Sequence, residues 1–252
     1  MPWLVAQGKK YGFATNYHAD TPGSLMDYLW LSSGSCHSAV NCTLPVGTHS
    51  FGCSGDSCSS PITDDNIFRE LNRAGLSWKV YAQSIPAAGY MGHNSGAYTD
   101  RHNPARWYSD VIDSAAEQQK MVPFTQLAAD LSANKLPNYS IIIPDVNNDA
   151  HDGTLRQADT FLSDNVAPLL NAPTFQPGGT GLMFITFDEC DGAIGACPEQ
   201  VYTAVIGPNV KPGTQSSTFY KHENMLRTIL DALGVSVYPG AAHDAVDMSD
   251  FF

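Results

Sequence analysis

The run Leu182–Phe187, within the stretch LMFITFDECDG (Leu182–Gly192), is apolar at nearly every position and ends directly at Asp188 and Glu189. A run of this length, preceded by Gly181, is typical of a strand buried on both faces of a parallel sheet, so we expect a central parallel strand here. Two adjacent carboxylates at its end repel each other unless a positive group lies between them. A divalent cation, which prefers carboxylate oxygens, is therefore the first hypothesis for this position.

Strand-like and helix-like segments alternate along the chain. The expected helix of 63–75 begins with Thr63 or Asp64 as its N-cap, because acids fill its first turn. Such alternation predicts an α/β fold, in which a parallel-dominated sheet carries helices on both faces. We expect one domain over residues 1–252, since no repeat or linker divides the chain. The expected helices are 2–11, 22–33, 63–75, 124–136, 155–171 and 222–235, and the expected strands are 12–17, 77–84, 139–145, 181–188 and 202–208.

The charge composition excludes several classes of partner. The chain has 25 acidic and 13 basic residues, which give a net charge of −12. Nucleic acids and anionic lipid surfaces both need a basic face, so we expect neither as a partner. No apolar run approaches the ~18 residues of a membrane helix, and we expect no stable membrane insertion.

The six cysteines fall into three pairs that are close in sequence, each within a loop rich in small or polar residues. No Cys-x-x-Cys motif or zinc-finger histidine spacing accompanies them, which disfavours a structural zinc site. We expect three short-range disulfides and hence an oxidising compartment, so that the protein is secreted or periplasmic. The expected pairs are Cys36–Cys42, Cys53–Cys58 and Cys190–Cys197.

Polar side chains gather after three of the expected strands. In open α/β sheets, ligands bind beyond the carboxyl ends of the strands, so these groups are the candidate site. We expect the remaining histidines, His37, His49, His93 and His243, at the surface. The three groups are His18, Asp20 and Ser24; Asp145, Asp149, His151 and Asp152; and Asp188 and Glu189.

A set of motifs in a fixed order resembles the phosphoesterase family of bacterial acid phosphatases and phospholipases C, within the alkaline-phosphatase-like superfamily. The motifs are GSLMDYLWLSSGS, RHNPARWY, NDAHDG, ITFDECDG and GPNVKPG followed by FYKHENMLRTILDALGV. The resemblance extends from about residue 2 to the C-terminus. The resemblance implies an alkaline-phosphatase-like fold and hydrolysis of a phosphate ester through a phosphoserine intermediate.

The resemblance also assigns roles to individual residues. It identifies Ser24 as the nucleophile, with Thr21 as the reserve candidate, and makes Asp188, Glu189 and Ser24 the ligands of a divalent metal ion of open identity. His102 and His151 are implied to hold phosphate oxygens and to protonate the leaving group. Asp27, Asp149 and His222 are implied to contact the substrate.

Two features depart from the family pattern. Asp27 replaces the usual Asn, which removes an amide donor and adds a carboxylate. The family begins with a strand and a Glu-Asn motif that supplies metal ligands, and no such motif precedes Ser24. We therefore expect an N-terminally shortened domain with an incomplete metal site. The sheet edge left by a missing strand is a surface that a second copy could cover, so a homo-oligomer stays open.

The predicted function is metal-dependent hydrolysis of a phosphate ester, of the acid phosphatase or phospholipase C type. The resemblance leaves open whether the ester is a monoester, a diester or a phospholipid headgroup. One alternative is a non-catalytic or weakly active shortened phosphoesterase domain. The other is a serine carboxyl-ester hydrolase that uses Ser24, although TPGSLMD lacks the G-x-S-x-G elbow of such enzymes.

Overall fold

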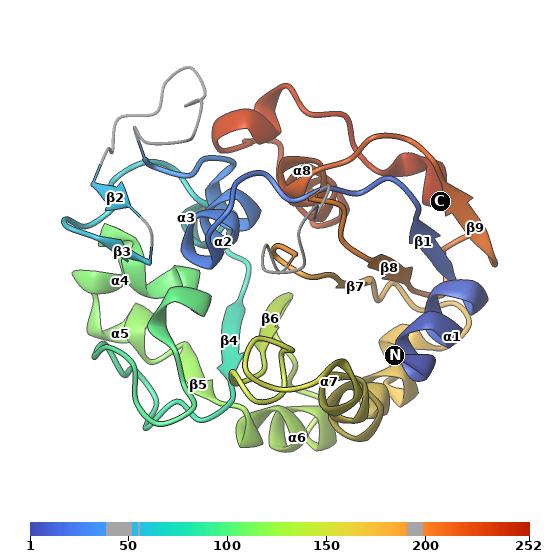
Figure 1. Cartoon of the computed structure of the whole chain (residues 1–252), viewed down its shortest axis with the longest axis horizontal. Coiled ribbons are helices and arrows are strands. Elements are labelled where there is room, and N and C mark those ends of the chain that lie inside the picture. The colour runs from blue at the N-terminus through green and yellow to red at the C-terminus, as the bar shows by residue number, and fades with distance from the viewer. Residues whose placement is uncertain (39–51, 55, 191–198) are drawn as a thin grey trace. The chain divides into compact units, whose positions relative to one another are not determined.

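The computed structural model describes residues 1–38, 52–54, 56–190 and 199–252 (Figure 1). Contacts along the chain divide it into two compact units, each assembled from separate segments. Unit 1 comprises Met1–His18, Val146–Tyr220 and Met248–Phe252, and unit 2 comprises Ala19–Asp145 and Lys221–Asp247. The single domain over residues 1–252 stays a prediction.

Unit 2 contains a three-stranded, fully parallel sheet in the order β5 (Met121–Pro123), β4 (Trp78–Ala82), β6 (Tyr139–Ile143). The central strand β4 was expected from the alternation of apolar and polar residues over 77–84, and four of its five residues are buried. The short strand β5 was not expected. The α/β class with parallel strands is confirmed by this sheet.

Helices cover both faces of this sheet. Successive side chains of β4 point to opposite faces, and the buried side chains on each face contact the helices there. Val80 belongs to the hydrophobic core that includes Leu25, Phe68 and Leu226 from three helices. On the other face, the Tyr81 hydroxyl donates to Asp130 at 2.7 Å. The four helices that cover the two faces are α2 (Ser24–Ser33), α3 (Ile67–Arg73), α6 (Thr125–Ser132) and α8 (His222–Ala232).

Helix α3 begins later than the sequence suggested. Its N-cap is Asn66, whose side chain accepts a hydrogen bond from the Arg69 amide at 3.0 Å, rather than Thr63 or Asp64. The Asn66 amide group also donates to Asp110 at 3.1 Å, which fixes the cap in place. The expected N-cap is therefore wrong, because a contact that is distant in sequence selects among several capping residues.

A glycine stands at each end of helix α2. Gly23 precedes it with a φ of 112°, and Gly34 follows it with a φ of 63°. An L side chain at either position would be strained, and a Cβ on Gly34 would lie 2.7 Å from the Pro239 carbonyl oxygen. The glycines therefore set where the helix starts and stops.

Unit 1 contains a mixed four-stranded sheet in the order β7 (Met183–Ile185), β8 (Thr203–Ile206), β1 (Gly12–Ala14), β9 (Thr214–Ser216). The β7–β8 and β8–β1 pairs are antiparallel, and the β1–β9 pair is parallel. β7 stands at one end of this order and its side chains are half-buried. The expectation of a central parallel strand at 182–187 is therefore wrong, since an apolar run does not specify the direction of its partner.

Helix α1 (Pro2–Lys10) packs on this sheet through Leu4, which clusters with Ala204 and Ile206 of β8. Asp159 of α7 (Leu155–Phe161) accepts the backbone amides of Trp3 and Leu4, each at 3.0 Å, and so holds the start of α1. The expected helix of 155–171 is α-helical only to Phe161. The rest forms the π-helical η3 (Leu162–Val166) and the 3-10 helix η4 (Ala167–Asn171), where Pro168 lacks an amide donor.

The remaining elements are short. In unit 2, a two-stranded ribbon of β2 (Cys53–Ser54) and β3 (Ser57–Cys58) is closed by the disulfide Cys53–Cys58, which confirms one of the three predicted bridges. Cys42 and Cys197, the predicted partners of Cys36 and Cys190, lie outside the described residues. The other short helices are α4 (Ser109–Ile112), α5 (Ala115–Gln118), η1 (Asp100–His102), η2 (Pro104–Trp107), η5 (Pro173–Phe175), η7 (Gly240–His243) and η8 (Ser249–Phe251).

None of the helices in the described ranges combines the length and the apolar character that crossing a membrane requires.

Candidate functional site

Ser24 is the first residue of helix α2, directly after the N-cap Gly23, and it is 95% buried. The N-cap position itself belongs to Gly23, so Ser24 does not cap the helix. The first amides of a helix attract anions, because they have no partners within the helix and stand at the positive end of its dipole. Ser24 therefore occupies a position suited to a nucleophile that attacks a phosphate ester.

Asp27, one turn further along α2, is fully buried and reaches back to the segment before the helix. Its Oδ1 accepts the backbone amides of Asp20 at 3.0 Å and Thr21 at 3.1 Å. An Asn in this position could accept the same two bonds through its amide oxygen. Accepting these two hydrogen bonds therefore does not require the negative charge that the Asp27 carboxylate carries.

His222 and Asp20 join the start of α8 to this segment. The His222 amide donates to Asp20 Oδ2 at 3.2 Å, and Lys221 Nζ lies 3.1 Å from Asp20 Oδ1. The His222 ring nitrogen Nε2 lies 3.6 Å from Asp27 Oδ1. One ligand atom from each of Asp20, Asp27 and His222 can be chosen so that all three lie within 4.8 Å of one another, which is a spacing that fits a cation.

Glu223 adds a further acid beside this group. Burial raises the pKa of Glu223 to about 7, and the negative charge of Asp20 raises it as well. A carboxyl group with such a pKa lies in a region that is poor in water and rich in negative charge. Carboxyl groups therefore gather at the start of α8, where Lys221 is the neighbouring basic residue.

His102, at the end of η1, is buried and packs against helix α2. Its ring stacks on Tyr28 with the ring centres 5.2 Å apart and the planes inclined by 19°. Tyr28 follows Asp27 on the first turns of α2. Helix α2 contacts both η1 and α8, and α2 and α8 lie near each other in Figure 1. Unit 2 thus brings four of the predicted residues to α2 and its neighbours: Ser24, Asp27, His102 and His222.

The predicted residues Asp149 and His151 lie in the loop 146–153 of unit 1. Asp149 Oδ1 accepts the His151 amide at 2.8 Å, and His151 Nδ1 lies 2.8 Å from Asp152 Oδ1. Ala150 has a φ of 76°, a left-handed conformation that is uncommon for a residue with a side chain. The side chain of His151 is 43% exposed, so it is accessible to a ligand.

Asp145, which ends the first segment of unit 2, is 6% exposed and accepts a hydrogen bond from the Ser84 hydroxyl at 2.6 Å. This acid follows strand β6 as expected, and its contact with Ser84 joins it to the end of the neighbouring strand β4.

Asp188 and Glu189 follow strand β7 in unit 1 and are half-buried. Two carboxylates from adjacent residues provide oxygen donors of the kind that a divalent cation prefers. The donor set therefore fits the expected metal. Since Ser24 belongs to unit 2, its participation in the same metal site stays a prediction.

The sequence model of the Phosphoesterase family matches residues 1–236. The chain belongs to the Phosphoesterase family.

Two curated proteins are similar to most of the chain. A probable acid phosphatase of Kluyveromyces lactis is 29% identical over 240 residues, which cover 91% of this chain and 52% of that protein. A phosphatidylinositol-3-phosphatase of Mycobacterium tuberculosis is 28% identical over 234 residues, which cover 93% of this chain and 70% of that protein. This phosphoesterase thus spans about half of the length of the first relative.

A structure from a study of glycosaminoglycan metabolism in Bacteroides thetaiotaomicron is 10% identical, with a TM-score of 0.57. It covers 99% of this chain and 75% of the other. At this identity the likeness supports the α/β fold alone.

Two charged neighbours of Asp20 in this phosphoesterase, Lys221 and Glu223, were not predicted from the sequence, and Asp20 was placed only near the site. The available signal was the end of strand β1 followed by the sequence NYHAD, together with KHE at the start of an amphipathic helix. Neither pattern shows that Asp20 accepts the amide of His222, which is 202 positions away.

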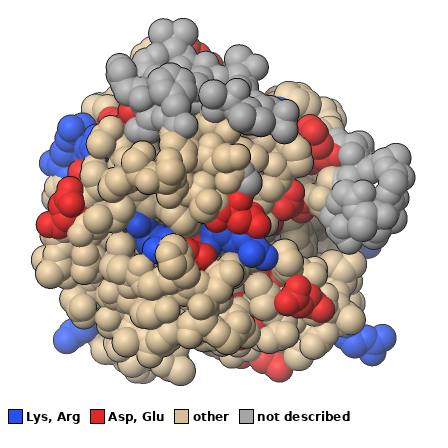
Figure 2. Space-filling model, turned by 60° about the vertical axis from the view of Figure 1, so that its left-hand side comes forward, with Lys and Arg blue, Asp and Glu red and all other residues tan. Residues whose placement is uncertain are grey.

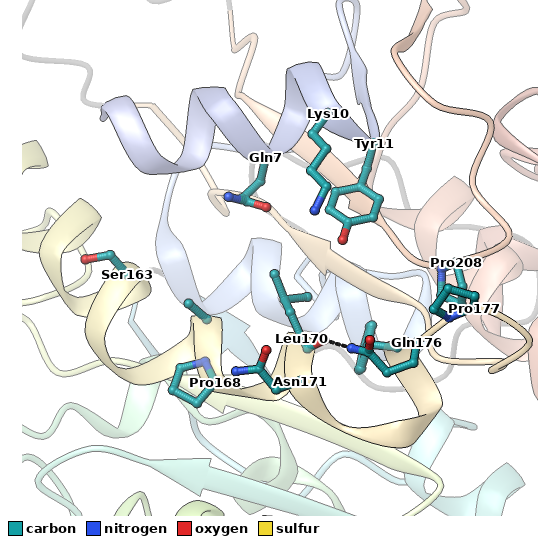
Figure 3. Close-up of a pocket in the computed structure, with 12 residues that line it drawn as sticks. Gln7, Lys10, Tyr11, Ser163, Pro168, Leu170, Asn171, Gln176, Pro177 and Pro208 are labelled. Carbon is teal, nitrogen blue, oxygen red and sulfur yellow. Dashed lines mark hydrogen bonds between the residues drawn. The ribbon is translucent and has the colours of Figure 1, made fainter.

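Unit 1 contains a groove that is lined by other residues than those of the candidate site. It has a volume of about 830 Å³, and Gln176 Nε2 donates to the Leu170 carbonyl oxygen at its side at 2.7 Å (Figure 3). Apolar and amide side chains dominate its lining, with Lys10 as a charged member. No predicted site residue is among the residues that line it: Gln7, Lys10, Tyr11, Ser163, Ala167, Pro168, Leu170, Asn171, Phe175, Gln176, Pro177 and Pro208.

Charged side chains are mixed on the face of the phosphoesterase drawn in Figure 2. Basic side chains there lie beside acidic ones and form no continuous basic surface among the residues shown in colour.

Proposed function

We propose that this phosphoesterase hydrolyses phosphate esters, with Ser24 as the nucleophile. The observation that carries the proposal is the position of Ser24 as the first residue of α2, in a chain that the family matches over residues 1–236. The relatives named acid phosphatase and phosphatidylinositol-3-phosphatase support this reaction class.

The reaction that follows from this assignment is a double displacement. The Ser24 hydroxyl gives its proton to water and Oγ attacks phosphorus, which forms a phosphoserine. The bond between phosphorus and the ester oxygen breaks, and the departing oxygen takes up a proton and leaves as the alcohol. Water then hydrolyses the phosphoserine and restores the hydroxyl. The amides at the start of α2 would stabilise negative charge on the phosphoryl oxygens.

On the basis of the family motifs, we propose that His102 and His151 bind the non-bridging phosphate oxygens. Asp149 and His222 are the supporting residues. His102 is held against α2 by Tyr28, which limits its orientations. His151 is partly exposed and would be able to transfer a proton to a leaving alcohol.

A divalent cation would be held by Asp188 and Glu189, whose adjacent carboxylates suit it. When bound, such an ion supplies Lewis-acid chemistry and offsets charge on a phosphoryl group.

We also propose that the protein works in an oxidising compartment, outside the cytoplasm. The Cys53–Cys58 disulfide supports this, since such bonds are rare where thiols are kept reduced.

The test measures hydrolysis of an aryl phosphate by the unmodified protein, Ser24→Ala and Ser32→Ala. Ser32 is a matched control, because it lies in the same helix and its hydroxyl bonds to the Tyr28 carbonyl and the Tyr108 hydroxyl instead. Ser24→Ala should lose activity by about three orders of magnitude or more, as loss of a nucleophile does elsewhere. Ser32→Ala should keep most of it.

Trapping the intermediate adds a second readout. Acid quenching and peptide mass spectrometry should find phosphate on Ser24 in the unmodified protein. Full activity of Ser24→Ala, or loss of activity in Thr21→Ala with phosphate on Thr21, would show that the nucleophile is assigned wrongly.

A further inference from the structure

We propose that Asp20, Asp27 and His222 form a second cation site, which takes a transition-metal dication such as Zn²⁺ or Mn²⁺. Its ligands differ from the predicted metal ligands Asp188 and Glu189, and all three lie in unit 2. The proposal does not depend on which ester the protein hydrolyses.

The first support is convergence in a buried place. The ligand atoms of the three residues lie within 4.8 Å of one another. The side chains of Asp27 and His222 are fully buried, and that of Asp20 is 2% exposed. Two carboxylates removed from water in this way are costly unless positive charge compensates them.

The second support is the charge that remains after the neighbours are counted. Lys221 offers one positive charge, at 3.1 Å from Asp20, and the Asp27 carboxylate faces the His222 ring at 3.6 Å. The two carboxylates of Asp20 and Asp27 thus face one ammonium group and one imidazole, and a dication bound by a neutral imidazole would supply the positive charge that Lys221 alone does not.

The third support is a pair of buried oxygen atoms without a hydrogen-bond partner in the described part of the chain. One is the hydroxyl of Thr21, a residue that is 95% buried and whose amide is bound to Asp27. The other is Oε2 of Glu223, next to the ligand His222 in the chain. Such atoms are rare in folded proteins, and oxygen donors beside two carboxylates are what a coordination shell uses.

The donor set also indicates the kind of ion. One imidazole nitrogen with carboxylate oxygens suits Zn²⁺ and Mn²⁺, whereas Mg²⁺ and Ca²⁺ prefer oxygen ligands alone. We therefore expect Zn²⁺ to bind more tightly than Mg²⁺ at this site.

The experiment uses calorimetry with Zn²⁺ on the full chain after treatment with a chelator. Four proteins are compared: the unmodified chain, Asp27→Asn, Asp188→Asn/Glu189→Gln, and the triple variant. Asp27→Asn is the sharpest change, because the Asn oxygen can still accept the amides of Asp20 and Thr21 while the charge is lost.

The double variant Asp188→Asn/Glu189→Gln should still bind about one equivalent of Zn²⁺ through its remaining donors. Adding Asp27→Asn should weaken that binding on the order of 100-fold, since a charged ligand is removed. Co²⁺ gives a spectroscopic readout: its visible absorption in the double variant should be lost on His222→Gln as well as on Asp27→Asn.

Equal urea midpoints of the chelated variants serve as the folding control. Binding that is unchanged by Asp27→Asn, or a double variant that binds no Zn²⁺, would overturn the second site. Failure of the Asp188–Glu189 site has a different signature, because the double variant would then bind as much Zn²⁺ as the unmodified chain.

Discussion

The His222 ring nitrogen Nε2 lies 3.6 Å from Asp27 Oδ1, and both side chains are fully buried although 195 residues separate them in the chain. The same Asp27 oxygen accepts the amides of Asp20 and Thr21. Asp20 in turn accepts the His222 amide. These bonds join the segment before α2 to the start of α8, and they fix the backbone that leads to Ser24.

Replacing Asp27 should separate this bracing role from its charge. Asp27→Ala leaves two buried amides without their acceptor, and each such group costs about 1–3 kcal/mol. We expect Asp27→Ala to lower the free energy of unfolding by about 2–4 kcal/mol in the presence of a chelator, and Asp27→Asn to lower it much less. Urea denaturation measures both, and equal losses in the two variants would show that the charge, rather than the two hydrogen bonds, stabilises this segment.

Removing one of the paired acids after β7 should abolish binding at the predicted catalytic metal site. Asp188→Asn should reduce the affinity for a divalent cation and lower phosphate ester hydrolysis by orders of magnitude, because the metal offsets charge in the reaction. Asp164→Asn is the matched control, since Asp164 is an exposed acid of the same unit.

Calorimetry should be run in the Asp27→Asn background, so that binding by the second proposed site does not mask the effect. Metal affinity and activity that are both unchanged in Asp188→Asn would remove this residue from the site.

Local patterns in the sequence predicted most of the secondary structure. The segment WKVYA formed the central strand β4, and HENMLRTILDA formed α8 from its first residue, because each element is specified by its own apolar spacing. The helix ends were predicted less well. Asn66 caps α3 because Asp110, 44 positions away, holds its side chain.

Pairing between distant segments could not be predicted from these patterns. The strand at Met183–Ile185 was found, but its antiparallel pairing depends on β8, which follows a loop of unrelated sequence. His37 was expected at the surface and is buried, where Ser33 lies 2.8 Å from Nε2 and Asp64 lies 3.4 Å from Nδ1. His93 and His243 are exposed as expected, and His49 lies outside the described residues.

Contacts between distant segments also limited what the sequence could predict about the candidate site. Family motifs located Ser24, Asp27, His102 and His222, which the structure places around α2. Asp20 lies in none of the quoted motifs, and Glu223 lies in FYKHENMLRTILDALGV without an assigned role; the burial of both acids is visible only in the folded chain.

The cysteine pairs give a prediction that chemistry can check directly. Non-reducing peptide mapping should recover the Cys53–Cys58 bridge and the predicted bridges Cys36–Cys42 and Cys190–Cys197. Since Cys53–Cys58 closes a loop with a sequence separation of 5, replacing both by Ser should lower the free energy of unfolding by about 2 kcal/mol on the chain-entropy estimate. Free thiols, or bridges between different loops, would contradict the predicted pairing and the oxidising compartment inferred from it.

The contact between Arg69 and Asp110 predicts a dependence of stability on pH. Arg69 Nη2 lies 2.7 Å from Asp110 Oδ2, and Asn66 donates to the same oxygen. Burial raises the pKa of Asp110, but the hydrogen bonds from Arg69 and Asn66 and the charge of Arg69 outweigh it, so the pKa lies below its usual value. A carboxyl with a lowered pKa stabilises the folded state above its unfolded pKa of about 4, and this contribution is lost as the pH falls towards the folded pKa.

Asp110→Asn should therefore lower the free energy of unfolding by about 1–3 kcal/mol at pH 7 and by clearly less at pH 3, where the wild-type carboxyl is gaining its proton. Urea denaturation at the two pH values measures the difference. Asp113→Asn, at an exposed position after the same short helix, should change stability little at either pH. A loss in Asp110→Asn that is the same at pH 3 and pH 7 would show that the side chain acts through its shape and neutral hydrogen bonds, and that its ionisation does not stabilise the contact between α3 and α4.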